Sequence, residues 1–195
     1  PLLVGGSGIF QDTWNGEEFV RLVAEHGIQH TSGATPFLHD LLEAAKSTEY
    51  DLSSLKHFCC MGAPIPRVMV EEARTLLPSL SVFGGWGQTE CGLVTMTAPG
   101  DSEEKITGTY GRALGAMKVR IVDPLGEPVG PGEEGRVQVT GPFLFVGYLD
   151  EPKKTAESFD GEWLDTGDLA EMDDEGFIRI AGRSKDIIIR GGENI

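Results

Sequence analysis

Residues 84–92, Gly-Gly-Trp-Gly-Gln-Thr-Glu-Cys-Gly, carry the densest set of potentially reactive groups in the chain. Four glycines allow the backbone to turn tightly and to approach a ligand closely. Trp86 can stack on a base, the Thr89 hydroxyl can donate to a phosphate oxygen, and the Glu90 carboxylate can bind Mg²⁺. Holding ATP requires these three abilities, so the stretch predicts a nucleotide site. The alternative is a glycine-rich turn after a strand, with Trp86 in the core.

The elements that must position this stretch alternate between strand and helix. The sequence predicts, in order, a helix capped by Asn15 and ending at Gly27, a strand at 28–31, a helix capped by Thr35 with Pro36 at its first position, a strand at 55–60, a helix from Pro66 to Pro78 and a strand at 80–83. This order indicates right-handed βαβ units and a mostly parallel sheet. Ligands bind beyond the carboxyl ends of such strands, where residues 61–64 and 84–92 form unusual loops.

The second half of the chain changes to period-two alternation. Residues 118–122 and 136–139 read as strands, 152–158 as a short helix, and 169–172 with 177–180 as a hairpin around 173–176. The sequence therefore predicts an α/β unit followed by a small antiparallel, barrel-like β unit. The β-forming run 187–189 begins a further element just before the chain ends, so the sequence looks cut.

Composition narrows the class of partner. A formal net charge of -15 argues against binding to a nucleic-acid backbone. No apolar run approaches the ~20 residues of a membrane span, and residues 1–6 do not form a signal peptide. Cys59, Cys60 and Cys91 lack zinc-site spacing, so we expect free, mostly buried thiols in a reducing cytoplasm. We expect His30 to be a sheet residue, with a place beside an acyl pocket as the alternative.

Three short motifs follow one another along the chain: Trp-Gly-Gln-Thr-Glu at 86–90, Trp-Leu-Asp-Thr-Gly-Asp-Leu at 163–169 and Gly-Arg-Ser-Lys-Asp at 182–186. Residues 62–66 and 141–148 add two further family-like stretches. Together they resemble the acyl-adenylate-forming enzymes, which include acyl-CoA synthetases, adenylation domains of peptide synthetases and beetle luciferases. The likeness covers essentially the whole chain and is greatest to CoA ligases of medium-chain or cyclohexane-type carboxylic acids.

The resemblance implies a role for each matching residue. Thr89 and Glu90 would be catalytic, with Thr89 on the α-phosphate and Glu90 on Mg²⁺. The remaining implied roles are adenine stacking by Trp86, nucleotide contacts by Gly62, Ala63, Pro64 and Gly87, ribose binding by Asp168, ribose or phosphate binding by Arg183, a hinge at Lys185 and a coenzyme A channel at Arg190, Gly191 and Gly192. The alternatives without a function are a turn residue at Asp168, a surface ion pair at Arg183 and an ordinary polar residue at Lys185.

The implied reaction converts a small carboxylic acid, ATP and coenzyme A, with Mg²⁺, into acyl-AMP and then acyl-CoA. Residues 30–39 contain no Asp or Glu to bind an α-ammonium group, which favours a simple acid over an amino acid. The family's phosphate loop would precede residue 1 and its catalytic lysine would follow residue 195, so this piece is expected to be inactive alone. The alternatives are a non-catalytic nucleotide-binding or interaction module and a luciferase-type oxygenase.

The resemblance also implies a division of the chain. Residues 1–105 would form an α/β subdomain that is incomplete at its N-terminus, and 106–182 an antiparallel β subdomain. Residues 183–195 would hold the hinge and the start of a small C-terminal domain. We expect no nucleic-acid partner, and the oligomeric state stays open, a homodimer being one option.

Overall fold

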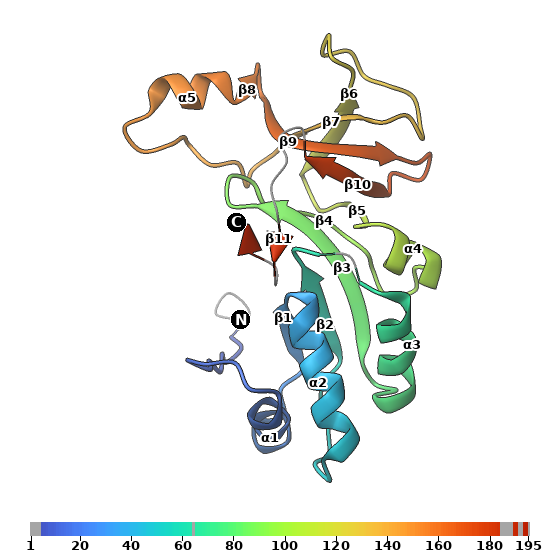
Figure 1. Cartoon of the computed structure of the whole chain (residues 1–195). Helices are drawn as coiled ribbons and strands as arrows, with labels where there is room; N and C mark the ends of the chain where they lie inside the picture. Colours follow the sequence, from blue (N-terminus) through green and yellow to red (C-terminus); the bar gives the residue numbers. More distant parts are fainter. Residues whose placement is uncertain (1–4, 64, 184–188, 191–192, 195) are drawn as a thin grey trace.

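The computed structural model describes residues 5–63, 65–183, 189–190 and 193–194 (Figure 1). The first half folds around a five-stranded sheet in the order β1-β2-β3-β4-β5. Its elements are α1 (Gly16–His26), β1 (His30–Gly33), α2 (Thr35–Ser47), β2 (His57–Met61), α3 (Arg67–Leu76), β3 (Ser81–Gln88), β4 (Gly92–Met96), α4 (Glu103–Gly108) and β5 (Arg112–Ala113).

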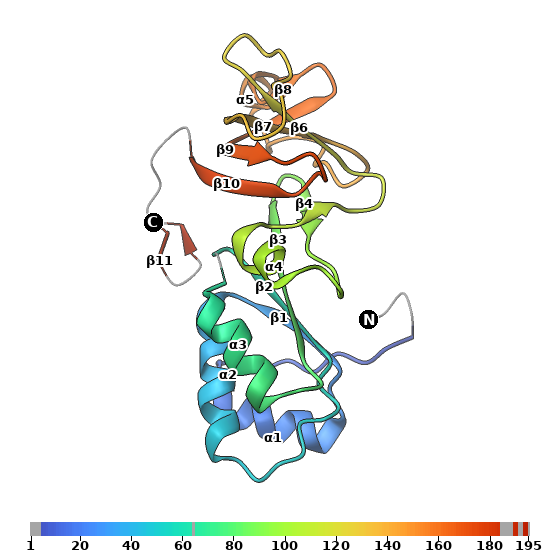
Figure 2. The same cartoon turned by 90° about the vertical axis from the view of Figure 1, so that its right-hand side faces the viewer.

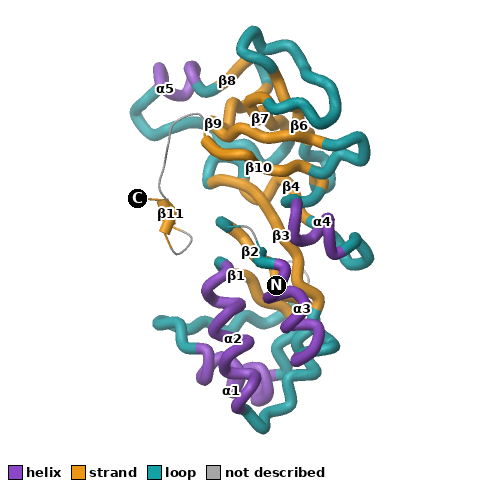
Figure 3. The backbone as a smooth tube through the Cα atoms, turned by 45° about the vertical axis from the view of Figure 1, so that its right-hand side comes forward, coloured by secondary structure: helices purple, strands orange, loops and turns teal. Residues whose placement is uncertain are grey.

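The first three strands are parallel, as the βαβ pattern predicts, whereas β4 and β5 are antiparallel to their neighbours. The predicted α/β class is therefore confirmed with a mixed sheet. Because β1, β2 and β3 are adjacent and parallel, crossovers of the usual right hand would place α2 and α3 on one face, and residues of both helices share one core with α1. Figure 3 shows these helices beside α1 along that sheet.

Local signals explain most helix boundaries. The Asn15 side chain accepts a hydrogen bond from the Glu18 amide at 2.8 Å, so Asn15 caps α1 as predicted. The expected cap at Thr35 is wrong, because Ala34 is the N-cap of α2 and Thr35 is already helical. Pro36 still fits the first turn, where its missing N–H removes no intrahelical bond.

The third strand is longer than predicted. It does not end at residue 83 but runs through the glycines to Gln88, and a three-residue loop leads into β4, a strand that the sequence pattern did not predict. Gly87 makes this hairpin possible, since a Cβ there would lie 1.9 Å from the Gly92 carbonyl oxygen. The glycines thus serve close backbone approach within a strand pair rather than a free loop.

The second half forms a five-stranded antiparallel sheet in the order β10-β9-β7-β6, with β8 paired to β9. This open half-barrel confirms the predicted antiparallel, barrel-like unit. The elements are β6 (Lys118–Val122), β7 (Gly135–Thr140), α5 (Pro152–Glu157), β8 (Phe159–Asp160), β9 (Trp163–Met172) and β10 (Ile178–Arg183). A separate two-stranded pair joins β11 (Ile189–Arg190) to β12 (Glu193–Asn194); the predicted strand residues 187 and 188 lie outside the described residues.

Two hydrophobic cores support these sheets. One core joins α1, α2 and α3 to the first sheet, with Leu38, Leu41 and Phe58 almost fully buried. The other contains Trp86 and Val94 of the first sheet together with residues of the second sheet, so it spans both. Because both sheets contribute to this core, they pack against each other as one unit.

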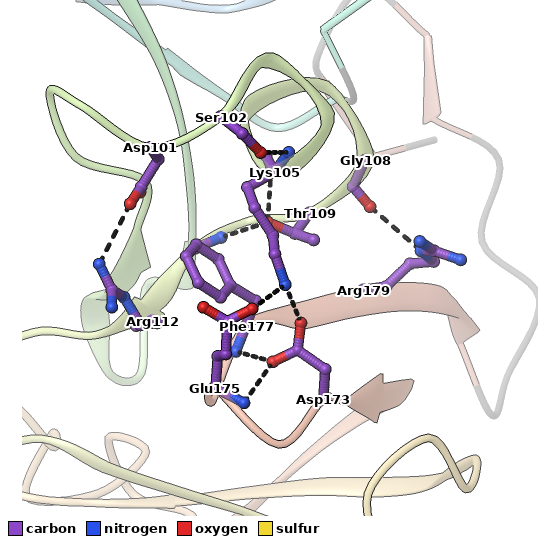
Figure 4. Close-up of polar contacts among 11 residues, drawn as sticks. Asp101, Ser102, Lys105, Gly108, Thr109, Arg112, Asp173, Glu175, Phe177 and Arg179 are labelled. Carbon is purple, nitrogen blue, oxygen red and sulfur yellow. Dashed lines mark hydrogen bonds and ion pairs between the residues drawn. The ribbon is translucent and has the colours of Figure 1, made fainter.

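Polar contacts strengthen the same junction (Figure 4). Lys105 of α4 reaches the turn between β9 and β10, where its Nζ lies 2.5 Å from Asp173 and 3.0 Å from Glu175. The ring of Phe177 lies 4.5 Å from the Lys105 ammonium and 4.5 Å from the Arg112 guanidinium. Backbone bonds between the segment 110–111 and Ile178 complete the contact. Figure 2 shows α4 lying close to β10.

The described part of the chain contains no helix of the length and apolarity that a bilayer crossing needs. All three cysteines are free thiols, as predicted, and Cys60 and Cys91 are buried while Cys59 is half-buried. His30 is a sheet residue, also as predicted: it lies in β1, and its ring stacks on His57 at 4.6 Å between centroids.

Candidate functional site

An open cavity of about 910 Å³ lies between the two sheets. Its walls come from the carboxyl ends of β1 and β2, from the β3–β4 hairpin, and from β9, β10 and Tyr148 on the other side. Topology explains the location, because parallel strands present their following loops at one edge of a sheet. Among the lining residues are Gly62, Trp86, Gly87, Gln88, Thr89, Glu90, Tyr148, Thr166, Asp168 and Arg183.

Trp86 belongs both to the cavity wall and to the core. The residue is 8% exposed and packs within the shared core. Its indole nitrogen donates to Asp168 Oδ2 at 3.1 Å. Trp86 is therefore mostly a core residue, as in the alternative interpretation, and it also lines the cavity. Adenine stacking by Trp86 stays a prediction.

Asp168 is the most connected side chain of the cavity. It lies within β9, so it is not the turn residue of the plainer alternative, and it is only 3% exposed. Oδ2 accepts hydrogen bonds from Trp86 and from Gln88 Nε2, the latter at 2.8 Å. Oδ1 accepts a hydrogen bond from Arg183 Nε at 2.8 Å, in an ion pair whose arginine side chain is 29% exposed. A buried carboxylate that accepts from an indole, an amide and a guanidinium is fixed in position.

Thr89 and Glu90 occupy the loop between β3 and β4. The Cys91 amide donates to the Gln88 carbonyl at 3.2 Å, which closes the turn and leaves Thr89 exposed on the cavity wall. Glu90 Oε1 accepts a hydrogen bond from the Tyr148 hydroxyl at 2.9 Å. The Glu90 carbonyl also accepts the Phe145 amide at 2.8 Å. Within the described residues, no hydrogen bond or ion pair engages Oε2.

The remaining predicted residues divide by location. Gly62 and Gly87 line the cavity, whereas Ala63 is half-buried and does not. The predicted nucleotide residue Pro64, the hinge residue Lys185 and the coenzyme A channel residues Gly191 and Gly192 lie outside the described residues, as does the side chain of Arg190.

Gln88 and Tyr148 are cavity residues to which the sequence analysis assigned no role, although both make polar contacts there. Gln88 bridges the two sheets, since its amide nitrogen donates both to Asp168 and to the Thr166 carbonyl at 2.9 Å. Tyr148 comes from the loop before α5 and reaches Glu90 across 58 positions of sequence. Both residues lie in motifs of the sequence, at 86–90 and 141–148, but their contact partners are so far away along the chain that only the fold identifies them.

Burial raises the pKa of two tyrosines that line the cavity. Burial, with a contribution from Asp168, raises the pKa of Tyr110 to about 12. Burial and the hydrogen bond to Glu90 likewise raise the pKa of Tyr148. Both phenols are consequently protonated at neutral pH, so the Tyr148 hydroxyl is available as a donor to the Glu90 carboxylate.

The donors present suit a magnesium–nucleotide complex. Mg²⁺ is usually held by one or two carboxylates together with substrate phosphates. Glu90 offers one such carboxylate on the wall, and no cluster of three or more potential ligands of the His, Cys, Asp or Glu type occurs among the described residues. The cavity volume lies within the ~300–1,000 Å³ typical of small-molecule sites.

Comparison with known proteins gives a consistent relationship. The chain is 36% identical over 197 residues to the medium-chain fatty-acid–CoA ligase of Escherichia coli, covering 100% of this chain and 34% of that protein. Its structure resembles the amide bond synthetase of Marinactinospora thermotolerans with a TM-score of 0.90 and 27% identity, covering 100% of this chain and 39% of that one.

A second solved structure is the O-succinylbenzoate coenzyme A synthetase of Bacillus subtilis in complex with ATP and magnesium ion. It matches 95% of this chain and 38% of its own length, with a TM-score of 0.81 and 31% identity. The chain thus spans between about a third and two fifths of the length of these three relatives.

A family model described as AMP-binding enzyme matches residues 1–149, which include the β3–β4 hairpin and Tyr148. The family match covers most of the chain. Residues of the motifs at 86–90 and 163–169 line the cavity together. The chain therefore belongs to the AMP-binding enzyme family.

Proposed function

We propose that the protein carrying this chain is an AMP-forming acid–thiol ligase that activates a carboxylic acid with ATP and transfers the acyl group to coenzyme A. One observation carries the proposal: one cavity is lined by Trp86, Thr89, Glu90, Asp168 and Arg183, the first and last of which are 97 positions apart in the sequence. Relatives named medium-chain fatty-acid–CoA ligase and feruloyl-CoA synthase support the same class.

The proposed reaction has two steps. A carboxylate oxygen attacks the α-phosphorus of ATP, the bond to pyrophosphate breaks, and acyl-AMP forms. The sulfur of the coenzyme A thiol then attacks the acyl carbon, its proton is lost, and AMP leaves. Activation is needed because oxide is a poor leaving group and AMP a good one. The protein mainly orients two anions and offsets their charge.

The residues of the chain have distinct proposed roles. The Thr89 hydroxyl donates to the α-phosphate, and the Glu90 carboxylate holds Mg²⁺, which would neutralise phosphate charge when bound. The Trp86 ring contacts the adenine base, and Arg183 donates to ribose or phosphate. Asp168 accepts hydrogen bonds from the ribose hydroxyls.

Asp168 cannot serve both ribose hydroxyls without a rearrangement. A carboxylate offers about four lone-pair positions, and Trp86, Gln88 and Arg183 occupy three. At least one donor must move when two hydroxyls bind. Arg183 is the best suited, because its partly exposed guanidinium can turn toward solvent or the nucleotide.

The test is a coupled assay on the whole protein with ATP, Mg²⁺, coenzyme A and a panel of straight-chain and cyclic carboxylic acids. We expect pyrophosphate, AMP and acyl-CoA in equal amounts, the last identified by mass spectrometry. Amine acceptors and a luciferin belong in parallel reactions, since related folds include an amide bond synthetase and a luciferase-like enzyme. Absence of pyrophosphate with every acid would reject the proposal.

Several finer points belong to the same proposal. The isolated 195-residue chain is expected to release no pyrophosphate with octanoate or cyclohexanecarboxylate. The division at residues 105 and 182, the hinge at Lys185, the channel at 190–192 and a cytoplasmic location are further parts of it. The hinge and the channel follow from the resemblance of the motifs, whereas the division follows also from the change to period-two alternation and the cytoplasmic location from the unpaired cysteines.

A further inference from the structure

Tyr148 is the cavity residue whose contacts point to a task beyond lining a wall. Its hydroxyl donates to Glu90 Oε1 at 2.9 Å, and both residues line the cavity. Glu90 is the proposed magnesium ligand, so a role for Tyr148 through Glu90 rests on the proposed function. A group that holds a metal ligand in place can matter nearly as much as the ligand itself.

The loop that carries Tyr148 grips Glu90 at two points. Besides the side-chain bond, the Phe145 amide donates to the Glu90 carbonyl at 2.8 Å. Main chain and carboxylate of Glu90 are therefore both fixed by one neighbouring loop. A carboxylate at the tip of a hairpin would otherwise be free to rotate away, and each free rotor costs entropy when a ligand fixes it.

The Tyr148 ring is itself held from several sides. Phe145 packs edge-on against it at 4.8 Å between centroids, and the Lys154 ammonium lies 4.3 Å from the ring centroid. The Tyr148 amide donates to Thr155 Oγ1 at 2.9 Å. Gly147 permits this approach, since its φ is +146° and a Cβ there would lie 2.9 Å from Thr155 Cγ2.

One carboxylate oxygen remains for another task. Tyr148 engages Oε1, and within the described residues Oε2 has no hydrogen bond or ion pair. A carboxylate oriented through one oxygen can offer the other to a cation at no further cost of orientation. We propose that Tyr148 is a positioning residue that orients Glu90 for Mg²⁺ bound with the nucleotide.

The test compares Tyr148→Phe with the wild type in the whole protein. This change removes only the hydroxyl and leaves the ring contacts with Phe145 and Lys154. Binding of a non-hydrolysable ATP analogue is measured by calorimetry across a Mg²⁺ series and again with EDTA, alongside pyrophosphate release. Tyr50→Phe is the matched control, because Tyr50 is 49% exposed and does not line the cavity.

We expect Tyr148→Phe to raise the half-saturating Mg²⁺ concentration about tenfold, at the lower end for residues that support a metal ligand. Affinity for the analogue in EDTA and the melting temperature stay at wild-type values. Thr155→Val removes the acceptor for the Tyr148 amide and also the hydroxyl that donates to the Glu151 carbonyl at 3.0 Å. It is expected to shift the Mg²⁺ dependence in the same direction by a smaller factor, and it serves if Tyr148→Phe does not fold.

Glu90→Gln provides the decisive comparison. If Tyr148 acts through Glu90, adding Tyr148→Phe to Glu90→Gln changes the Mg²⁺ dependence less than twofold. The inference would be overturned if the two substitutions shifted the half-saturating Mg²⁺ concentration independently, so that their factors multiply in the double variant. It would also be overturned if Tyr148→Phe weakened binding of the analogue equally with Mg²⁺ and with EDTA. Either result would leave the ligase proposal intact. A wild type that neither binds the analogue nor releases pyrophosphate would overturn the ligase proposal, and this inference with it.

Discussion

Replacing Asp168 with asparagine removes one charge from the centre of the cavity while keeping the size of the side chain. Whichever way the new amide is oriented, its NH₂ group faces at least one of the present donors. If the remaining oxygen keeps Trp86 and Gln88, the NH₂ group faces the Arg183 guanidinium and the ion pair is lost. The opposite orientation sets the NH₂ group against the indole and the glutamine amide.

The expected loss of stability follows from these contacts. Breaking a buried ion pair costs roughly 3–5 kcal/mol, but the 29% exposure of the Arg183 side chain lets water solvate the freed cation. We therefore expect a loss of about 2–3 kcal/mol, which corresponds to roughly 4–12 °C in melting temperature for a domain of this size. Thermal unfolding followed by circular dichroism measures it.

Asp160→Asn is the matched control, because Asp160 also pairs with an arginine, Arg120 at 3.0 Å, but its side chain is 61% exposed. A surface pair contributes about 0–1 kcal/mol, so this control is expected to melt near the wild type. AMP affinity of Asp168→Asn should also fall at least tenfold, the loss of about one charge-assisted hydrogen bond. Equal melting temperatures for the two variants would refute the reasoning.

Two further predictions concern the junction and the thiols. Lys105→Met removes the ammonium that bridges α4 to Asp173 in the β9–β10 turn, and it should lower the free energy of unfolding, measured by chemical denaturation, by about 1–2 kcal/mol. Lys153→Met is the control, because the Lys153 side chain is 88% exposed, and it should leave the free energy of unfolding unchanged. Burial, the largest cause in each case, raises the pKa of Cys60 to about 12 and of Cys91 to about 11, from 9.0. Both thiols should resist a disulfide reagent at pH 8 until the protein unfolds. Their contribution to stability is complete below pH 9 and should be lost as the pH rises through 11 and 12, because the unfolded thiols ionise first; an unchanged denaturation midpoint between pH 8 and 11 would contradict this.

Local signals in the sequence predicted much of the fold. The Asn15 cap, the alternation at 118–122 and the hairpin around 173–176 depend on neighbours within a few positions, and the structure has all three. The β3–β4 hairpin was not predicted because four glycines read as a loop. Only the fold shows that Gly87 pairs with Leu93 and lies so close to the Gly92 carbonyl that a side chain at residue 87 would not fit.

The cavity shows a similar division. Residue types and motif order predicted Trp86, Thr89, Glu90 and Asp168, and all four line it. The sequence could not show that the Asp168 carboxylate is already engaged by Gln88 and the indole, or that Tyr148 holds Glu90. Such partners lie 58 to 82 positions apart, and only the packing of one sheet on the other brings them together.

A crystal structure of the protein grown with AMP tests the central claim most directly. We expect the nucleotide in the cavity between the two sheets, its ribose hydroxyls on Asp168, its phosphate beside Thr89 and the Arg183 guanidinium displaced from Asp168. Nucleotide bound elsewhere, with the three donors to Asp168 unchanged, would contradict the proposal that these side chains form one adenylate site.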